Sequence, residues 1–449
     1  DVDGVTSSHL FLTALRRVGA KVDVVIPHRI QDGYGLSLHL LQQAKEDGVD
    51  TILTCDNGIA AIDEIAWAKA QKMTVLVTDH HAVPFEEHEG RRTEKKSLAD
   101  AVVNPHQQDC GYPYKELCGA GVAWNVIRVL YENYDMDKRE AEDLLDFVAM
   151  ATVCDVMSLT GENRILVKEG LKRIRHTKNI GLQALMQACN VQPENISAYH
   201  FGYVLGPCVN ATGRLDTARH ALRLFETGQE TEAEEIARDL VDLNQERKEL
   251  TLQGVEMAKK LCEEGGYEND PVLVLFLPDV HESIAGLIAG RIREMYNRPV
   301  FVLTRGEEGV KGSGRSTENY SMYENMCGCA ELFTKFGGHP MAAGLSLPEE
   351  NVEKFRRKIN ENCPLTVEEV CPDIHIDMAM PVGYASTELV HQFALLEPFG
   401  KDNPSPLFAD RNLSISRMWV IGKNRNVLRM SVLSEYGQPV PGIFFWGGG

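Results

Sequence analysis

Three features that would assign a protein class at a glance are missing from this sequence of 449 residues. No apolar run approaches the roughly 20 residues that a membrane-spanning helix needs. The 11 cysteines include no CxxC pair, which argues against a zinc knuckle or a redox centre. No internal repeat or low-complexity tract is present either. The sequence therefore predicts a reduced, cytoplasmic globular protein with no membrane partner.

Positive charge is scarce as well. Lysine and arginine total 46 against 65 acidic residues, so the formal net charge is −19. This balance argues against nonspecific binding of polyanions, and a nucleic-acid site would need local basic groups, because salt confines surface fields to about 8 Å. The length favours two or three domains. Because the chain begins at Asp1 without a methionine and ends at "FFWGGG", we expect a fragment clipped at both ends.

The first hundred residues alternate between short apolar runs and stretches with helical periodicity. Four runs are predicted to be strands: residues 21–27, 50–56, 74–81 and 100–105. Helix spacing of apolar residues predicts helices within 5–19, 35–48 and 59–72. Such alternation is typical of an α/β fold with a parallel sheet covered on both faces. The charged, non-periodic segment 85–96 is predicted to be an exposed loop.

A mostly helical region is expected over residues 118–224, followed by one long helix that ends at Gly265 and Gly266. A helix of that length between two strand-rich regions is interpreted as an interdomain strut. "PVLVLFLP" opens a second α/β unit, and short β-like runs near the C-terminus predict a small barrel or sandwich. The predicted regions are 1–229, 230–266, 267–363 and 372–449.

Polar side chains that can bind metals follow three of the predicted strands. They are Asp56 in "TCDNG", Asp79, His80 and His81 in "TDHH", and Asn104 in "VNPH". Ligands gather beyond the carboxyl ends of the strands in an open parallel sheet. We therefore expect these groups to meet at one edge.

Further acids are candidates for the same edge. Asp1 and Asp3 in "DVDG" would occupy it if a strand precedes them, with Gly4 suited to a tight turn into the following helix. Asp155 is a single acid at the end of an apolar, helix-like run. Carboxylates and imidazoles without clustered thiolates favour Mn²⁺ or Mg²⁺ over structural zinc, and a set of this size can hold two ions about 3.5–4 Å apart.

Each of these residues also has a purely structural interpretation. An acid after a strand is often a helix N-cap, and Asp155 alone fits that role equally well. An Asp-Asn-Gly sequence is commonly a turn, and two adjacent histidines can be a surface accident. The convergence of four clusters on one predicted edge favours the metal site.

Taken together, the motifs resemble those of the DHH phosphoesterase superfamily. "DVDG", "TCDNG", "TDHH" and "ATVCDVMSLTGENR" stand in the order of its motifs I to IV. "GPCVNATGRLDTA", "KFGGHPMAAGLS" and "LLEPFGKDNPSPLF" narrow the resemblance to the RecJ family of single-strand-specific DNA exonucleases, over essentially the whole chain. The resemblance implies a parallel-sheet DHH catalytic domain with a helical subregion, a connecting helix, a smaller α/β DHHA1 domain and a truncated OB-type β-barrel.

The resemblance also implies roles for individual residues. Five match the family's ligands for two Mn²⁺ or Mg²⁺ ions: Asp1, Asp3, Asp56, His80 and Asp155. Asp56 would bridge both ions, His81 would orient or protonate groups on the substrate, and Asp79 would support the histidines. The implied chemistry is hydrolysis of a phosphodiester, with 5′-mononucleotides removed stepwise from the 5′ end.

Two departures from the family pattern stand out. The residues that complete the first strand in related proteins, and that can supply another metal ligand, are absent before Asp1. Residues 279–283, "DVHES", stand where family members more often carry a tryptophan–histidine–proline–glycine-like turn.

Nucleic-acid contacts are expected from several glycine-rich or basic segments. "KGSGRS" is predicted to be a phosphate-binding loop, and "FGGHP" a second glycine-rich turn; a plain turn is the alternative for each. Their candidate residues, with Arg214 for the terminal 5′-phosphate, are Ser313, Arg315, Ser316, Gly337, Gly338 and His339. Lys423, Arg425 and Arg429 form either a basic groove of the OB-type barrel or a solvated basic hairpin.

The sequence therefore predicts a metal-dependent 5′→3′ exonuclease that acts on single-stranded DNA in repair and recombination. Expected partners are single-stranded DNA, a helicase and a single-strand-binding protein, and the chain is expected to be a monomer. One alternative is a small-substrate phosphodiesterase for oligoribonucleotides or cyclic dinucleotides, which the long helix and the C-terminal region disfavour. Another is a non-catalytic single-strand-binding scaffold, which the intact set of ligands disfavours.

Overall fold

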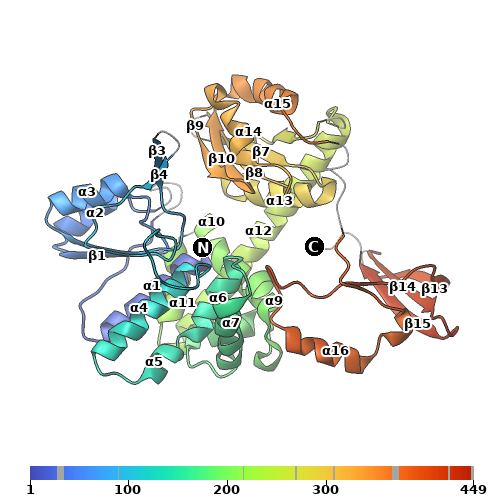
Figure 1. Ribbon diagram of the computed structural model, residues 1–449, viewed down its shortest axis with the longest axis horizontal. Helices are drawn as coiled ribbons and strands as arrows, with labels where there is room; N and C mark the ends of the chain where they lie inside the picture. Colours follow the sequence, from blue (N-terminus) through green and yellow to red (C-terminus); the bar gives the residue numbers. More distant parts are fainter. Residues whose placement is uncertain are drawn as a thin grey trace.

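The computed structural model describes residues 1–27, 35–88, 91–215, 217–267, 270–306, 309–366, 374–422 and 425–445. Figure 1 shows a helical body with a small parallel sheet beside it, a second α/β unit above it and a C-terminal β region at one side. Within the described ranges, no helix combines the length and the apolar character needed to cross a bilayer.

The N-terminal sheet is parallel, as predicted, with strand order β1 (Thr51–Cys55), β2 (Thr74–Thr78) and β5 (Ala101–Val103). Two helices pack on it, α2 (Leu38–Glu46) and α3 (Ile62–Ala70). Val75 and Val77 of β2 are buried together with Leu41 and Ile65 of these helices. Because alternate side chains of a strand point to opposite faces, this apolar face fixes the register of β2.

Three local predictions about this region are wrong. Residues 21–27 form no strand; Val24 and Ile26 pack against the helical core instead, so these apolar residues are partly buried without sheet pairing. Within the segment 85–96, Phe85, Glu86 and Glu87 are exposed, as predicted, but β3 (Phe85–His88) and β4 (Arg91–Glu94) pair as antiparallel strands instead of forming a loop. Gly4 lies inside α1 (Val2–Arg17) rather than in a turn before it.

The helical region predicted after residue 118 is confirmed. Its elements are α4 (Gly119–Asn133), α5 (Lys138–Glu142), α6 (Leu145–Cys154), α7 (Gly161–Ile174), α8 (Ile180–Ala188), α9 (Ala198–His200), η2 (Phe201–Leu205), α10 (Gly206–Leu215) and α11 (Ala218–Glu226). Together with α1 they enclose one apolar core, in which most of α6 is buried. A helix that is apolar all round has to be central, and α6 packs against α1, α4 and α7.

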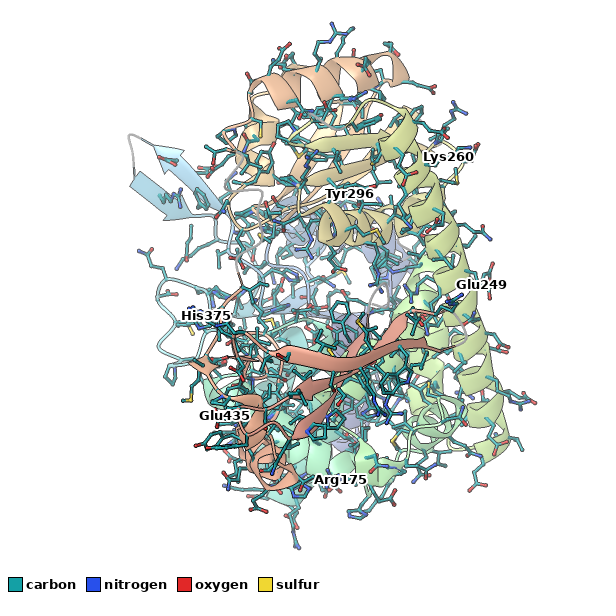
Figure 2. All side chains as sticks on the ribbon, turned by 90° about the vertical axis from the view of Figure 1, so that its right-hand side faces the viewer. Arg175, Glu249, Lys260, Tyr296, His375 and Glu435 are labelled. Atoms are coloured by element: carbon teal, nitrogen blue, oxygen red, sulfur yellow. The ribbon has the colours of Figure 1, made fainter. Side chains whose placement is uncertain are left out.

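The long helix α12 (Glu230–Glu264) has 35 residues and is confirmed. Its first half contributes Ala233, Ile236 and Leu240 to the core of the helical body. Its second half contributes Val255 and Ala258 to a separate core in the second α/β unit. Figure 2 shows α12 along one side of the molecule, with Glu249 and Lys260 on its outer surface.

The second α/β unit is built on a five-stranded sheet with strand order β6-β7-β8-β10-β9. Its strands are β6 (Leu273–Phe276), β7 (Val300–Gly306), β8 (Gly309–Arg315), β9 (Lys335–His339) and β10 (Ala342–Leu347). Its helices are α13 (Ala285–Tyr296), α14 (Met322–Cys327) and α15 (Val352–Glu361). Only β6 and β7 pair in parallel; the other pairs are antiparallel.

The C-terminal region carries the predicted β structure as a partial barrel. Strands β13 (Ser414–Ile421), β14 (Val427–Leu433) and β15 (Pro439–Phe445) form an antiparallel meander. They are preceded by the short strands β11 (Met378–Ala379) and β12 (Phe408–Ala409) and by α16 (Thr387–Phe393). Lys423, one of the predicted basic residues, lies outside the described residues; Arg429 lies over the ring of Trp419.

Candidate metal centre and nucleic-acid groove

Four elements deliver the candidate metal ligands to one place. Asp56 follows β1, and His80 follows β2, so the parallel pairing of these strands puts both at the same sheet edge. Asp3 comes from the first turn of α1. Asp155 is the C-cap of α6, so the N-cap interpretation does not hold.

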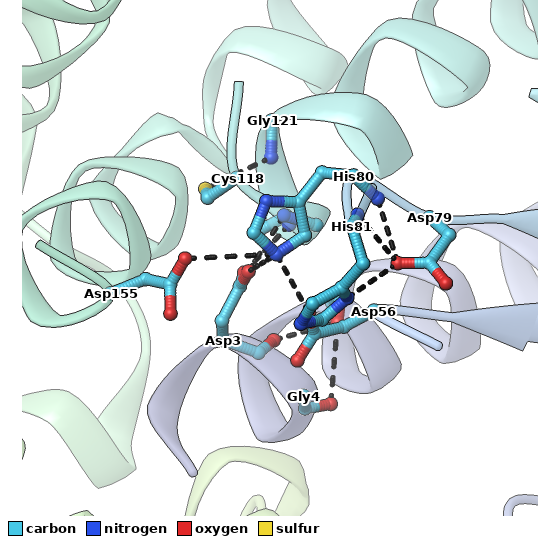
Figure 3. A network of polar contacts seen from close by, with 12 residues as sticks. Asp3, Gly4, Asp56, Asp79, His80, His81, Cys118, Gly121 and Asp155 are labelled. Carbon is cyan, nitrogen blue, oxygen red and sulfur yellow. Dashed lines mark hydrogen bonds and ion pairs between the residues drawn. The ribbon is translucent and has the colours of Figure 1, made fainter. Parts of the chain in front are cut away.

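These side chains converge on the imidazole of His80 (Figure 3). Its Nε2 atom lies 3.1 Å from Asp56 Oδ1 and 3.6 Å from both Asp3 Oδ2 and Asp155 Oδ2. Two triads each bring three candidate ligand atoms within 4.8 Å of one another: Asp3, His80 and Asp155, and Asp56, His80 and His81. Such a donor set of carboxylates and imidazoles fits Mn²⁺ or Mg²⁺.

The N-terminus of α4 holds Asp3 in place. The backbone amides of Gly119 and Ala120 donate to Asp3 Oδ2 and Oδ1, at 2.6 and 2.7 Å. A Cβ atom on Gly119 would lie 2.7 Å from Asp56 Cβ, so only glycine allows α4 to begin this close to the ligands. Sequence reasoning missed Gly119; the only signal was "CGAG" at the start of an apolar helix.

The buried carboxylates repel one another, and this indicates a need for cations. Burial and the neighbouring Asp3 carboxylate raise the pKa of Asp56 to about 9. The same two causes raise the pKa of Asp155 to about 6. A divalent cation between these groups would remove that penalty and displace their protons. The residues present therefore fit a metal centre.

Asp79 positions the two histidines and is itself buried. Its Oδ1 atom accepts hydrogen bonds from the amides of His80 and His81 and lies 2.7 Å from His81 Nδ1, while its Oδ2 atom accepts from the Ile59 amide. Burial favours the neutral acid, but the bonds from His81 and Ile59 outweigh it and lower the pKa of Asp79. The bond to Asp79 raises the pKa of His81, whose side chain remains 57% exposed. Asn104 completes the support by donating to the His81 carbonyl.

Asp1 lies at the edge of this cluster. It is the N-cap of α1, with Oδ1 accepting from the Gly4 amide, and a Cβ atom on Gly4 would lie 3.3 to 3.4 Å from both Asp56 Oδ2 and Asp1 Oδ1. Its role as a metal ligand stays a prediction. The Val2 amide donates to Asn210 Oδ1, a contact that sequence reasoning missed although Asn210 stands in the quoted "GPCVNATGRLDTA".

The predicted loop "KGSGRS" and turn "FGGHP" are wrong as structures, because both segments are mainly strands of the second sheet. "KGSGR" is the end of β8, and "FGGH" belongs to β9. Gly312 and Gly314 are required for packing: Cβ atoms there would lie 2.4 Å from Leu303 and from Met322 Sδ. They make room for core side chains and do not form an amide cradle for an anion.

The opposite sheet face carries the polar candidates in rows across β8, β10 and β9. Ser313 pairs with Gly344, which pairs with Gly337. Two strand residues further on, Arg315 and His339 both pair with Ala342 from either side. Residues two apart on a strand share a face, so these rows form one surface.

Three of the predicted phosphate-binding residues meet at the start of α13. Arg214 Nη1 donates to the Ser283 carbonyl across 2.6 Å, which joins α10 to the second α/β unit. A Cβ atom on Gly286 would lie 2.7 Å from Arg315 Nη2 and 3.4 Å from Ser313 Oγ. Ser316 is different: it is buried, and its hydroxyl donates to the Tyr320 carbonyl. Gly338, in β9, has a φ of 155°.

A groove of about 420 Å³ opens on this sheet face. Its lining includes Lys311 and Ser313 of β8 and Lys335 and Gly337 of β9, the two strands on either side of β10. Lys311 and Lys335 both pair with Ser346, so the two ammonium groups flank one strand. The lining therefore combines small residues with two lysines and the acid Glu282, which forms an ion pair with Lys311.

Comparison with known proteins identifies the class. Models of the DHH family N-terminal domain, the DHHA1 domain and the RecJ OB domain match residues 1–152, 269–363 and 376–449. The chain thus combines a DHH-family N-terminal domain, a DHHA1 domain and a RecJ OB domain.

Individual relatives narrow this class further. The chain is 35% identical to the single-stranded-DNA-specific exonuclease RecJ of Haemophilus influenzae, over 97% of the chain and 78% of that protein. It is 33% identical to the Bacillus subtilis RecJ over 98% of the chain, but spans only 54% of that protein. The chain belongs to the RecJ family.

Solved structures agree with this assignment. The Mn²⁺ complex of RecJ from Thermus thermophilus superimposes with a TM-score of 0.80 at 28% identity, covering the whole chain and 66% of that structure. A second exonuclease RecJ bound to manganese gives a TM-score of 0.69 at 31% identity, over 82% of the chain and 89% of that structure.

Proposed function

We propose that this chain is the catalytic part of a metal-dependent exonuclease that degrades single-stranded DNA from its 5′ end to 5′-mononucleotides, in DNA repair and recombination. The observation that carries the proposal is the convergence of Asp3, Asp56, His80 and Asp155, from four separate elements, on one point. The likeness to RecJ exonucleases that were solved with manganese supports it.

The arrangement of the candidate ligands suits two ions. Asp56 turns one oxygen toward His80 and the other toward Gly4 and Asp1, so it faces both sides of the site. Two Mn²⁺ or Mg²⁺ ions bound there would supply charge neutralisation and activation of water for in-line displacement at phosphorus. His81 presents an exposed imidazole whose orientation Asp79 fixes, so it can hold or donate a proton at the substrate.

Helix α10 contacts both the segment that carries Asp3 and the groove on the second sheet. Asn210 of α10 binds the Val2 amide beside Asp3, and Arg214, about one turn further on, binds the Ser283 carbonyl at the groove. Lys311 and Lys335 would attract backbone phosphates, and Arg214, Ser313 and Arg315 would hold the terminal 5′-phosphate at the N-terminus of α13. No base-reading group is needed, in keeping with sequence-independent degradation.

The protein would act as a cytoplasmic monomer on strands exposed by a helicase and covered by a single-strand-binding protein. The local basic groove within a chain of net charge −19 would confine nucleic-acid binding to one face.

The test uses 5′-labelled single-stranded DNA with Mn²⁺. We expect Asp56→Ala and His80→Ala to lose at least about 100-fold in mononucleotide release, because each removes a ligand shared by the cluster. Asp239→Ala, an exposed acid on α12, is the matched control and should retain wild-type activity. Full activity in both ligand variants would overturn the metal mechanism, and wild-type binding without cleavage would favour the scaffold alternative.

A further inference from the structure

Two tyrosines form an exposed stacked pair that the proposed mechanism does not use. Tyr199 of α9 and Tyr203 of η2 have ring centroids 5.1 Å apart and an interplanar angle of 24°. The two residues are 63% and 71% exposed. Large aromatic rings are normally buried, so a stacked pair in solvent is a candidate binding surface.

The pair is anchored directly beside the end of α6. A Cβ atom on Gly202 would lie 3.5 Å from Val153 Cγ1, and Cys154 Sγ donates to the carbonyl of Phe201. Gly206 approaches so closely that a Cβ atom there would lie 2.4 Å from Cys154 Sγ. The residue that follows Cys154 is the metal ligand Asp155, whose side chain is 30% exposed.

A lysine reaches the same segment from the far end of the chain. In "EPFGKDNPSPLF", the carbonyl of Lys401 accepts a hydrogen bond of 2.9 Å from the Leu159 amide. A Cβ atom on Gly400 would lie 2.5 Å from Leu159 Cδ1, so the loop is seated against the residues that follow Asp155. Asn403 braces this loop by donating to the carbonyls of Leu396 and Pro398.

The side chain of Lys401 is itself exposed. An exposed cation and an exposed aromatic pair therefore flank the segment from Val153 to Leu159 from two different parts of the chain.

Resting on the proposed function, we propose that Tyr199, Tyr203 and Lys401 form a binding subsite for the nucleotides that follow the scissile phosphodiester. The tyrosine rings would stack on nucleobases, and Lys401 would bind a backbone phosphate of the same strand. Aromatic rings stack on every base, so the subsite adds affinity without reading sequence. It would favour a long strand over a dinucleotide, since only the former reaches it.

The experiment measures the preference for length with three 5′-phosphorylated substrates in Mn²⁺. They are the dinucleotide of thymidine, a 20-nucleotide thymidine strand, and the same strand with abasic residues at positions 3 to 6. Wild type should prefer the 20-mer to the dinucleotide in kcat/KM and lose most of that preference on the abasic strand. Tyr199→Ala/Tyr203→Ala should lower the preference about tenfold and respond no further to the abasic residues, with turnover of the dinucleotide unchanged.

Matched variants separate this subsite from general surface effects. Lys401→Ala should raise KM for the 20-mer with little change in kcat, whereas Lys178→Ala, with a side chain 91% exposed, should not. Tyr134→Ala, 58% exposed at the end of α4, is the control for the tyrosine pair. A Tyr199→Ala/Tyr203→Ala protein that keeps the wild-type length preference and abasic response would overturn the proposal, and the proposed function would stand.

A binding measurement makes the two failures distinguishable. Fluorescence anisotropy of the labelled 20-mer, without added Mn²⁺, reports the subsite independently of cleavage. If wild type binds but cleaves nothing, the proposed function fails, and the subsite is supported by an affinity about tenfold weaker in the tyrosine double variant. Equal affinities in that case would overturn the subsite too.

Discussion

The candidate metal centre and the groove on the second sheet differ in how far their charged groups are buried. The carboxylates of the centre are largely buried, and Asp3 and Asp79 are fixed by two or more backbone amides each. The charged groups of the groove stand on a floor of small residues, and Lys311 is 45% exposed while it pairs with Glu282. Buried charge depends strongly on geometry, whereas exposed charge is screened and adjustable. Substitutions in the metal centre should therefore abolish activity, whereas substitutions in the groove should reduce it only partly.

The sharpest test of this contrast is Gly119→Ala. The added methyl group would meet Asp56 Cβ at 2.7 Å and displace a ligand without removing one. A shift of about 1 Å in a catalytic group can cost about 100-fold, so we expect at least that loss in mononucleotide release. Gly290→Ala in α13, where nothing lies within 4 Å of the new Cβ, should leave activity unchanged. Equal activity in both variants would show that the centre tolerates displacement.

The pH dependence of metal binding is the next largest effect. In the metal-free protein the raised pKa of Asp56, about 9, means that a proton competes with the cation below that pH. Mn²⁺ affinity should therefore rise between pH 6 and 8 by close to tenfold per unit, as isothermal titration would show. Asp56→Asn should bind weakly and without that slope. A flat profile in wild type would mean that the carboxylates do not hold protons.

Substitutions of the groove lysines should weaken DNA binding only partly. Lys311→Gln/Lys335→Gln removes two exposed cations, so KM for single-stranded DNA should rise several-fold while kcat changes little. The slope of log affinity against log salt should fall by about 1.4, since each phosphate contact on a single strand contributes about 0.7. Lys354→Gln, a lysine on α15, is the control. An unchanged salt slope would move the DNA path away from this groove.

The smallest expected effect on activity comes from Asp146, a buried acid outside the metal cluster whose substitution tests stability. It is buried in α6, accepts from the Thr177 hydroxyl, and burial raises its pKa to about 6. Because the folded protein holds the proton more tightly, stability from this group is present at low pH and falls as the pH rises from about 4 to 6, by no more than about 3 kcal/mol. Urea unfolding should show that the free energy of unfolding of wild type, relative to that of Asp146→Asn, falls as the pH rises from about 4 to 6. The buried His9 titrates alike in both proteins and cancels in the difference.

The sequence predicted that Asp56 and His80 would meet, because the ends of parallel strands lie at one edge of a sheet. The parallel pairing of β1 and β2 was enough to bring Asp56 and His80 together, and no knowledge of side-chain packing was needed. Gly119 and Asn210 could not be found this way, because their roles come from close approach between elements far apart in the chain.

The errors have the same origin. "KGSGRS" has the composition of a turn, yet pairing with β7 and β10 and the bulk of Leu303 and Met322 make it a strand with glycines on its inner face. Residues 21–27 have the composition of a strand, but burial of Val24 and Ile26 against the helical core replaces sheet pairing. Local propensity was overridden by tertiary packing in both cases.

The shared membership of α12 in two cores has a geometric consequence. Each residue of a helix adds about 1.5 Å and turns the chain by about 100°. A single residue inserted near its middle would leave both cores intact in composition but rotate the second by more than a quarter turn. The sheet that carries Arg315 would then be turned away from its orientation relative to His80. The length of α12 therefore fixes how the second α/β unit is oriented relative to the candidate metal centre.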